Sequence, residues 1–472
     1  MAKRATIVLD IGKTLSKAGL WDAEGSLLAK RARPNERQES GEYLALDASA
    51  IAEWLIGVLR EFSALTNVGR IIPVSHGAGA ALIHGGQLIL PPLDYEHPIP
   101  SAVRREYDAV RDPFAHTGSP ALPDGLNLGA QLYYLEALHP EAFQAGTQIM
   151  PWAQYWSWLL CGVACTEVTS LGCHTDLWCP ASADFSSLAV SRGWAELMAP
   201  LRRAGKALGT LLPAWQARTG LPADTQVHCG LHDSNAALLA ARGFREVADD
   251  EATVLSTGTW FVAMRTPKQP IAISTLADGR DCLVNVDAFG QMIPSARFMG
   301  GREIELLTGI DARRIDIKPE QPALLNALAP TIDGQAMMLP TLAAGTGPYP
   351  HARGHWLSMP EDQFERRAAV CLYAALLADA SLDLIGSARC LLVEGRFAES
   401  DAFVRALATM RPTTVVYTAN THSDVSYGAL RLLDSRLPPP GELRLVEPLP
   451  LDLAGYRARW RAQAERMENA DA

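Results

Sequence analysis

The chain opens with a strand, a polar turn and a second strand that returns beside the first. Residues 6–9 form a β-rich run that ends at Asp10, and the turn over residues 11–17 contains two lysines and two hydroxyl side chains. Short runs over residues 18–22 and 26–31 extend this pattern to an antiparallel meander. A meander excludes a P-loop and a Rossmann site at this position, because both require a glycine motif followed directly by a helix.

An acid at a strand end, followed by a turn with Gly, Thr and Lys, suits a nucleotide phosphate and its Mg²⁺ ion. We expect the hydroxyls of this turn and Lys13 or Lys17 to meet phosphate oxygens, and Asp10 to hold a hydrated metal ion. Taken alone, the turn is equally typical of a charged hairpin in solvent, and this alternative stays open.

The stretch over residues 227–260 places another acid at the start of a helix. An apolar run ends at Val227 and a Gly-containing turn presents His232 and Asp233. An Ala/Leu-rich helix follows, for which Ser234 or Asn235 is the expected cap. A carboxylate in such a turn can take a proton from an alcohol. The alternative is that Asp233 is only a helix cap.

A turn rich in hydroxyl groups and glycine follows about twenty residues after Asp233. We expect a strand over residues 252–255 to run into this turn, which contains Ser256, Thr257, Gly258 and Thr259. The backbone N–H groups of such a turn can hold phosphate oxygens. An ordinary strand-to-strand turn remains the alternative.

Length and charge limit the classes of protein that this chain can represent. It has 472 residues, of which 48% are hydrophobic, so we expect two domains of about 200 residues or more each. A net charge of −10 and the lack of a Lys/Arg run argue against nucleic-acid binding. The sequence has no apolar segment of membrane-spanning length and no signal-peptide core. We therefore expect a cytoplasmic protein with no nucleic-acid partner and no membrane partner.

Four of the eight cysteines lie close together around His174, which raises the question of a metal site. These four are Cys161, Cys165, Cys173 and Cys179. No Cys-x-x-Cys pair occurs among them, so we expect buried apolar thiols, with a metal site as the minor alternative. Disulfide bonds are not expected in a cytosolic chain of this size.

The order of the remaining elements predicts a duplicated domain. We expect helices over residues 48–65, 152–161 and 187–203, and a long irregular loop over residues 91–124 that covers a site. Each half begins with antiparallel strands around a polar turn and continues with alternating helices and strands. This pattern indicates a mixed α/β domain that occurs twice, with the two polar turns facing one cleft.

The motifs together resemble those of the FGGY carbohydrate kinases, within the actin/Hsp70/hexokinase ATPase superfamily. Six segments carry the resemblance, in the family's order: the opening Asp-x-Gly-Thr-Thr-Ser motif at residues 10–25, the central signature at 152–176, the turn with the catalytic aspartate at 230–233, the second phosphate turn at 256–260, and adenosine-pocket motifs at 393–400 and 423–429. The resemblance covers most of the chain. It implies an α/β fold of two ribonuclease H-like (actin/hexokinase-type ATPase) domains around a central cleft.

The resemblance also implies domain boundaries. Residues 1–245 would form an N-terminal sugar-binding domain, residues 246–436 a C-terminal nucleotide-binding domain, and residues 437–472 a linker and a terminal helix. Two departures from the family are visible. Lys13 stands where a hydroxyl residue is usual, and Glu394-Gly395-Arg396 replaces the usual Gly-Gly of the adenosine motif. The second departure leaves the nucleotide preference open, because side chains occupy a place where backbone normally meets adenosine.

In the mechanism that the resemblance implies, Asp233 accepts the proton of a sugar hydroxyl while the γ-phosphoryl group of Mg-ATP is transferred. The implied ligands of ATP are Asp10, Gly12, Lys13, Thr14, Lys17, Ser256, Thr257, Gly258, Thr259, Gly301, Gly395 and Arg396. Asp10 and Asp233 would lie next to Mg²⁺. The residues expected to touch the sugar are His76, Gly77, Glu96, His232 and Asp233. For His76, a loop histidine satisfied within the protein is the alternative.

The expected substrate is a ketose such as L-rhamnulose, L-fuculose or xylulose, and a deoxyhexulose is favoured among them. The small-molecule partners are then the sugar and ATP, and a homodimer is the default expectation for the assembly. One alternative is a catalytically reduced relative that binds sugar and nucleotide as a regulator, which the altered adenosine motif suggests. Another is a filament-forming or chaperone-like ATPase on the same superfamily fold.

Overall fold

The chain forms two compact units, each assembled from separate stretches of sequence. The computed structural model describes residues 4–311, 315–420, 425–439 and 441–471. The first unit contains Met1–Gly243, Val284–Met292 and Asp424–Pro438; the second contains Phe244–Leu283, Ile293–Ser423 and Pro439–Ala472. The domain limits at residues 245 and 436 stay predictions.

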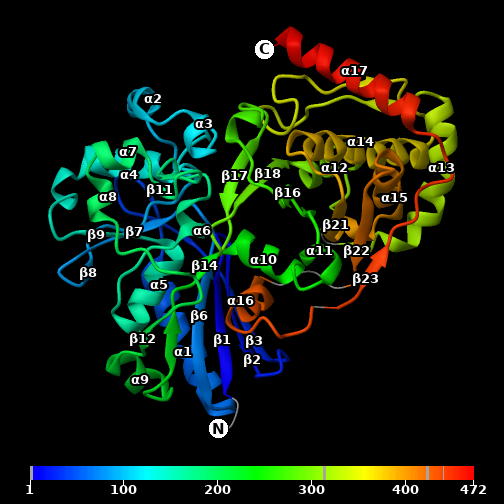
Figure 1. The fold of residues 1–472 in the computed structure, drawn as a ribbon. Coiled ribbons are helices and arrows are strands. Elements are labelled where there is room, and N and C mark those ends of the chain that lie inside the picture. Colours follow the sequence, from blue (N-terminus) through cyan, green and yellow to red (C-terminus); the bar gives the residue numbers. More distant parts are fainter. Residues whose placement is uncertain (1–3, 312–314, 421–424, 440, 472) are drawn as a thin grey trace. The chain divides into compact units, whose positions relative to one another are not determined.

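A seven-stranded sheet forms the centre of the first unit (Figure 1). Its strands, in spatial order, are β12 (Ala207–Thr210), β13 (Gln226–His228), β6 (Val68–Ser75), β1 (Ala5–Ile11), β2 (Leu15–Trp21) and β3 (Leu27–Pro34), and β14 (Leu231–His232) pairs with β6. Strands β1, β2 and β3 are joined antiparallel, which confirms the predicted meander. Strand β6 runs parallel to β1, β13 and β14.

Helices and smaller strands surround this sheet. The helices are α1 (Ala48–Leu65), α2 (Ser101–Val110), α3 (Phe114–Thr117), α4 (Leu128–Leu138), α5 (Trp152–Cys161), α6 (Val168–Leu171), α7 (Ser187–Ser191), α8 (Trp194–Leu197), α9 (Pro213–Thr219), α10 (Asp233–Ala241) and α16 (Val425–Leu433), with a 3-10 turn at Pro140–Ala142. The smaller strands are β4 (Arg37–Glu39), β5 (Leu44–Leu46), β7 (Ala80–His84), β8 (Gln87–Leu88), β9 (Gln148–Pro151), β10 (Trp178–Cys179) and β11 (Asp184–Phe185).

Strand β1 shows why both faces of the sheet are covered. All of its residues are buried, and successive side chains point to opposite faces, as the two-residue period of a strand requires. Ile7, Leu9 and Ile11 pack in a cluster with side chains of α1 and α5. Val8 packs in a different cluster with side chains of α10 and α16. Because both faces of the strand are buried, its sequence is a nearly continuous apolar run.

Helices α10 and α16 lie side by side and approach each other closely (Figure 1). A Cβ atom on Gly428 would stand only 1.7 Å from the carbonyl oxygen of Ala236, so glycine is required at this contact. Tyr427 and Ala429 are buried in the same cluster. These side chains pack against a helix of the first unit, and the adenosine motif at residues 423–429 stays a prediction. Ser423 lies outside the described residues.

Two predictions of secondary structure are wrong. The irregular loop expected over residues 91–124 contains α2 and α3, and α2 buries a single side chain, Tyr107. The helix expected over residues 187–203 is divided into α7 and α8, because Gly193 adopts a left-handed conformation between them (φ 73°). The helices expected over residues 48–65 and 152–161 are confirmed.

The second unit repeats the strand pattern of the first. Its sheet has the order β17 (Cys282–Val286), β18 (Met292–Phe298), β16 (Phe261–Thr266), β15 (Ala252–Thr257), β21 (Cys390–Gly395), β22 (Val415–Ala419) and β23 (Leu443–Leu445). Strand β15 is antiparallel to β16 and parallel to β21, just as β1 is antiparallel to β2 and parallel to β6. Residues 437–472, expected to be a linker and a terminal helix, therefore also supply a strand, β23.

The helices of the second unit pack on this sheet around one core. They are α11 (Arg245–Ala248), α12 (Gly300–Thr308), α13 (Gln321–Asp333), α14 (Gln363–Leu384), α15 (Asp401–Met410) and α17 (Ala454–Asp471), with 3-10 turns at Ile273–Thr275, Lys318–Glu320 and Arg396–Glu399 and the strand pair β19 (Met337–Met338) and β20 (Trp356–Leu357). Helix α14 begins at a cap in which the Asp362 carboxylate accepts the N–H groups of Phe364 and Glu365. None of the helices in the described ranges is long and apolar enough to cross a membrane.

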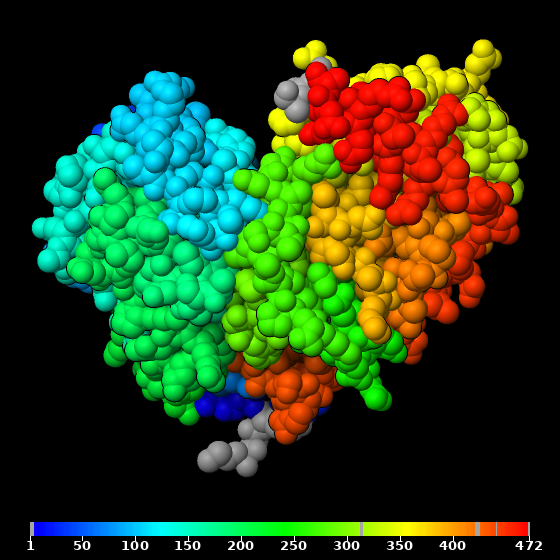
Figure 2. Space-filling view, turned by 45° about the horizontal axis from the view of Figure 1, so that its top comes forward, coloured from blue at the N-terminus to red at the C-terminus, as the bar shows by residue number. Residues whose placement is uncertain are grey.

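The terminal helix α17, red in Figure 2, is fixed to the second unit by aromatic and charged contacts. The indole of Trp460 is fully buried and donates a hydrogen bond of 2.7 Å to the carbonyl oxygen of Met338. Arg457 contacts the buried carboxylate of Asp379 at 2.6 Å. The expected polar helix is thus confirmed, although one of its faces is part of the core.

Helix α6 is attached to β14 through a buried carboxyl group. Glu167 accepts the N–H of Thr169 at 2.9 Å and the hydroxyl of Thr169 at 2.5 Å. The same hydroxyl oxygen accepts the N–H of His232 at 2.9 Å. Glu167 is fully buried, and burial raises its pKa to about 7.

This carboxyl group predicts a pH dependence of stability. We expect the free energy of unfolding to fall as the pH rises from about 4.5 to about 7, because the folded protein keeps the Glu167 proton in a range where the unfolded chain releases it. The contribution is complete below the unfolded pKa and is lost above the folded pKa. It is on the order of 3 kcal/mol.

The variant Glu167→Gln, which has no proton to release, should lose this dependence. Unfolding by urea at a series of pH values, for the wild type, Glu167→Gln and the exposed control Glu141→Gln, measures the effect. The control should follow the wild type. Parallel curves for the wild type and Glu167→Gln would show that Glu167 has an ordinary pKa in the folded protein.

Candidate active site

Three elements of the first unit deliver polar side chains to one edge of its sheet. Strand β6 is parallel to β1 on one side and to β14 on the other, with Ser75 opposite Ile11 in β1 and opposite His232 in β14. Parallel strands end at the same edge, so Asp10, His76 and Asp233 lie at or just beyond the carboxyl ends of neighbouring strands. Ligands of open α/β sheets bind at this edge.

The Asp233 turn depends on one glycine. Gly230 has a φ of +83°, and a Cβ atom there would stand 2.3 Å from the carbonyl oxygen of Pro73 in β6. The chain can therefore cross β6 closely before β14 pairs with it. Helix α10 then begins at Asp233, with His232 as its cap residue. The prediction that Ser234 or Asn235 caps this helix is wrong, because the helix starts before them.

One oxygen of the Asp233 carboxylate is bound by neighbouring groups, and the other is free of partners in the described part of the chain. Its Oδ1 accepts the N–H of Ser234 at 2.6 Å and lies 3.2 Å from Nε2 of His232. Oδ2 has no hydrogen-bond partner among the described residues, and 30% of the side chain is exposed. Burial raises the pKa of Asp233, and the nearby His76 opposes this rise. A carboxylate with one fixed and one open oxygen is arranged to accept a proton.

His232 is placed to orient this carboxylate. Burial lowers the pKa of His232 to about 4, so the ring is neutral at neutral pH. Its Nδ1 lies 3.4 Å from the amide nitrogen of Asn235, a donor, so Nε2 carries the hydrogen and can donate it to Asp233.

His76 presents an unused acceptor in the same area. Its Nδ1 lies 2.6 Å from the carbonyl oxygen of Gly77 and donates to it. Its Nε2 is buried and has no partner in the described part of the chain. Burial lowers the pKa of His76, which favours the neutral ring with a lone pair on Nε2. Gly77 lets the turn approach, since a Cβ atom there would stand 3.0 Å from His232.

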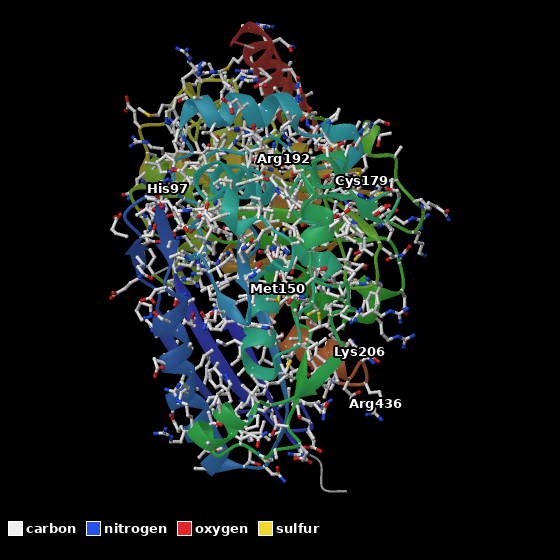
Figure 3. The ribbon with its side chains drawn as sticks, turned by 90° about the vertical axis from the view of Figure 1, so that its left-hand side faces the viewer. His97, Met150, Cys179, Arg192, Lys206 and Arg436 are labelled. Atoms are coloured by element: carbon white, nitrogen blue, oxygen red, sulfur yellow. The ribbon has the colours of Figure 1, made fainter. Side chains whose placement is uncertain are left out.

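The loop after β8 brings two carboxylates and a tyrosine to this area. The Asp94 side chain is fully buried, accepts the N–H of Glu96 at 2.9 Å and is ion-paired with Lys13. Glu96 is partly exposed and is paired with Arg37 of β4, so it lies at the rim. The ring of Tyr95 contacts His76 edge to face at 5.6 Å. His97, labelled in Figure 3, stacks on Tyr134 and anchors the loop.

The polar turn between β1 and β2 is tightly closed. Lys17 Nζ contacts Asp10 Oδ2 at 2.9 Å across the strand pair, and the N–H of Gly12 donates to the carbonyl oxygen of Leu15 at 3.1 Å. Thr14 is exposed at the tip of the turn. Asp10 is buried, and a single strand-end carboxylate fits Mg²⁺, which usually keeps most of its waters in proteins.

Asn35, which follows β3, holds this turn in place, and the sequence analysis missed this role. Its side-chain nitrogen donates to the carbonyl oxygen of Gly12 at 2.7 Å, and its oxygen accepts the hydroxyl of Ser16 at 2.8 Å. Its backbone N–H donates to the carbonyl oxygen of Thr14 at 2.9 Å. No local motif signals this role, because Asn35 reaches the turn only after β3 has folded back along β2.

In the second unit, the predicted phosphate turn lies beside the predicted adenosine motif. The hydroxyl of Ser256 donates to the Glu394 carboxylate at 2.7 Å. The hydroxyl of Thr257 donates to the carbonyl oxygen of Glu394 at 2.6 Å and accepts the N–H of Phe397 at 3.0 Å. Both hydroxyls therefore join β15 to β21, and the N–H of Gly258 closes the turn by donating to the carbonyl oxygen of Trp260 at 3.0 Å.

Two glycines make this assembly possible. A Cβ atom on Gly301, at the start of α12, would stand 1.9 Å from the carbonyl oxygen of Gly258. A Cβ atom on Gly395 would stand 2.2 Å from the carbonyl oxygen of Thr257. The structure thus brings Gly301, Gly395 and the turn together, as expected for parts of one site. Arg396 is paired with Glu399.

The cysteine cluster does not form a metal site among the described residues. In that part of the chain no three His, Cys, Asp or Glu side chains converge as metal ligands. Cys161, Cys165 and Cys173 are buried free thiols and Cys179 is half-buried. Cys165 faces Cys229, with 3.5 Å between the sulfur atoms.

Comparison with known proteins agrees with these features. The C-terminal domain model of the FGGY carbohydrate kinases matches residues 249–440. L-fuculokinase of Escherichia coli (strain K12) is 24% identical over 80% of this chain and 80% of that protein. L-fuculokinase of Salmonella typhi is 27% identical, and the match spans 56% of this chain and little more than half, 57%, of that protein.

The solved structures extend the agreement to the whole chain. The crystal structure of a carbohydrate kinase from Novosphingobium aromaticivorans is 59% identical, with a TM-score of 0.94, and the match covers 97% of this chain and 100% of that one. Solved sugar and glycerol kinases of much lower identity share the fold, which confirms the predicted class of two actin/hexokinase-type domains. The chain belongs to the FGGY carbohydrate kinase family.

Proposed function

We propose that this protein is an ATP-dependent kinase that phosphorylates a hydroxyl group of a ketose, with Asp233 as the general base. The observation that carries the proposal is the Asp233 carboxylate, which has one oxygen fixed by Ser234 and His232 and the other open beside His76. The similarity to two L-fuculokinases supports a ketose of the L-fuculose, L-rhamnulose or xylulose type.

The side chains of the first unit divide the work on the sugar. Asp233 accepts the proton of the reacting hydroxyl, and its raised pKa makes it a stronger base than an exposed aspartate. The neutral His232 keeps the carboxylate in one orientation. Nε2 of His76, the buried acceptor, receives a hydrogen bond from a second sugar hydroxyl. Together these groups fix the sugar so that one hydroxyl faces the base.

The nucleotide is held by the turns. Thr14 and Lys17 in the first unit and the turn over residues 256–259 in the second are the proposed phosphate ligands. Asp10 would hold a hydrated Mg²⁺ ion, which would supply positive charge to the phosphate oxygens. The hydroxyls of Ser256 and Thr257 act indirectly, since they set the position of the turn.

We expect the purified protein to phosphorylate at least one ketose with ATP. The test is a coupled assay of ATP turnover across L-fuculose-, L-rhamnulose- and xylulose-type ketoses, the corresponding polyols and aldonic acids. One ketose should exceed its polyol in kcat/KM by about tenfold or more, because the site is shaped for one arrangement of oxygens. Absence of turnover with every sugar would instead favour a regulatory relative that only binds sugar and nucleotide.

Replacement of Asp233 by Asn should abolish most of the turnover. The amide keeps the size of the side chain but cannot take a proton, so kcat should fall by about a hundred- to ten-thousand-fold. The melting temperature and the affinity for ATP should stay near those of the wild type. Asp184→Asn, an exposed carboxylate of the same unit, is the control. If Asp233→Asn keeps most of the wild-type kcat, Asp233 is a structural residue and not the general base.

Gly301→Ala should weaken ATP binding. The added methyl group would overlap the carbonyl oxygen of Gly258, so the turn over residues 258–259 must move away. We expect the KM for ATP to rise at least about tenfold, because a displacement on this scale breaks phosphate contacts. Gly455→Ala in α17 is the control, since a Cβ atom there meets nothing within 4 Å. An unchanged KM for ATP would separate Gly301 from the nucleotide.

A further inference from the structure

We infer that Lys13, which stands where the family has a hydroxyl residue, is a sugar-specificity residue that acts with Asp94 and is not a phosphate ligand. The inference rests on the proposed function for the identity of the sugar. It reverses the expectation from the sequence, in which Lys13 meets phosphate. It also assigns a role to Asp94, which the sequence analysis did not single out.

The position of the ammonium group carries the inference. Lys13 Nζ is ion-paired with Asp94, lies 3.9 Å from Glu96 and is 5.3 Å from the centre of the Tyr95 ring. Only 12% of the Lys13 side chain is exposed. Thr14, the next residue, is exposed at the tip of the turn. The lysine therefore turns inward, toward the loop that also contacts His76, whereas the tip of the turn faces outward.

The charge balance around Asp94 keeps Lys13 in this place. The Asp94 carboxylate is fully buried, and its neighbours are the N–H of Glu96, the Lys13 ammonium and, at 3.7 Å, the guanidinium of Arg37. A buried carboxylate that lost its cation would be strongly destabilised. A triphosphate that recruited Lys13 would leave the fully buried Asp94 without its ammonium partner, so the pairing opposes a role of Lys13 in phosphate binding. Lys17 differs, because 35% of its side chain is exposed beside Asp10.

The same side chains indicate which kind of sugar the site accepts. An ammonium group has three N–H donors, and the ion pair with Asp94 leaves others for a sugar oxygen. His76 adds an acceptor, and the Tyr95 ring lies beside the His76 ring. Lys13 and Arg37 are balanced by Asp94 and Glu96, so no uncompensated cation remains in this group to attract a carboxylate. The site therefore fits an uncharged sugar and disfavours a sugar acid.

The test separates the sugar from the nucleotide. Lys13→Thr, which restores a hydroxyl residue, and Lys13→Met are compared with Lys30→Met, an exposed lysine of β3. Calorimetry with a non-hydrolysable ATP analogue measures nucleotide affinity, and steady-state kinetics measure KM for the best ketose. We expect KM for the ketose to rise by about tenfold or more, with less than a twofold change in nucleotide Kd. The opposite result, a weaker nucleotide and an unchanged sugar, overturns the inference.

A general loss of structure is distinguished by a second readout. The variants are assayed with analogues of the ketose that each lack one oxygen. The analogue that lacks the oxygen bound by Lys13 should bind weakly to the wild type, and its affinity should not fall further in Lys13→Met. The affinity for each of the other analogues should fall in Lys13→Met by the same factor as that for the ketose. Equal losses with every analogue contradict a specific contact. If Lys13→Met folds poorly, Lys13→Met/Asp94→Asn removes both charges, and the same analogue pattern is expected.

The outcomes also separate this inference from the proposed function. If the wild type phosphorylates a ketose and only the nucleotide affinity of Lys13→Met changes, the inference alone fails. If the wild type phosphorylates no sugar, the proposed function fails. Nucleotide affinity then still tests whether Lys13 is a phosphate ligand. An unchanged nucleotide Kd in Lys13→Met supports the inference that Lys13 does not bind phosphate, and a tenfold higher Kd overturns that inference.

Discussion

The parallel pairing of β6 with both β1 and β14 is the constraint on which the candidate site depends. Because parallel strands end at one edge, residues that are far apart in sequence, at positions 10, 76 and 233, are brought to the same edge of the first sheet. The close passage at Gly230 makes the pairing of β14 possible. Glu167 and Thr169 of the α6 segment then hold β14 through hydrogen bonds, which fixes the backbone next to Asp233.

The two units use their polar side chains in different ways. In the first unit, Oδ2 of Asp233 and Nε2 of His76 have no partner among the described residues and are ready for a ligand. In the second unit, the hydroxyls of Ser256 and Thr257 are bonded to Glu394. Gly301 and Gly395 allow the backbone of these segments to pack closely against the turn, so a nucleotide there would meet mainly backbone groups. Backbone recognition suits phosphates, which need N–H donors without a particular side chain.

The departures from the family pattern are compensated locally. Glu394, which replaces a glycine, is buried and accepts the Ser256 hydroxyl, so its side chain belongs to the support of the phosphate turn. Lys13, which replaces a hydroxyl residue, is balanced by the buried Asp94. A substitution that introduces a charge into a buried site is tolerated when a hydrogen-bond donor or a partner of opposite charge lies within contact distance. Both partners lie far along the chain from the substituted position.

The sequence by itself determined the strand meanders, the long apolar helices and the polar turns, because each has a local signal: a two-residue period, a 3.6-residue period or a cluster of Gly and hydroxyl residues. The tertiary structure decided what the side chains in those turns do. The roles of Asn35, Asp94 and Thr169 depend on partners in other segments. A hydrogen bond or an ion pair between distant segments leaves no periodic trace in a single sequence, so these contacts emerge only when the chain is folded.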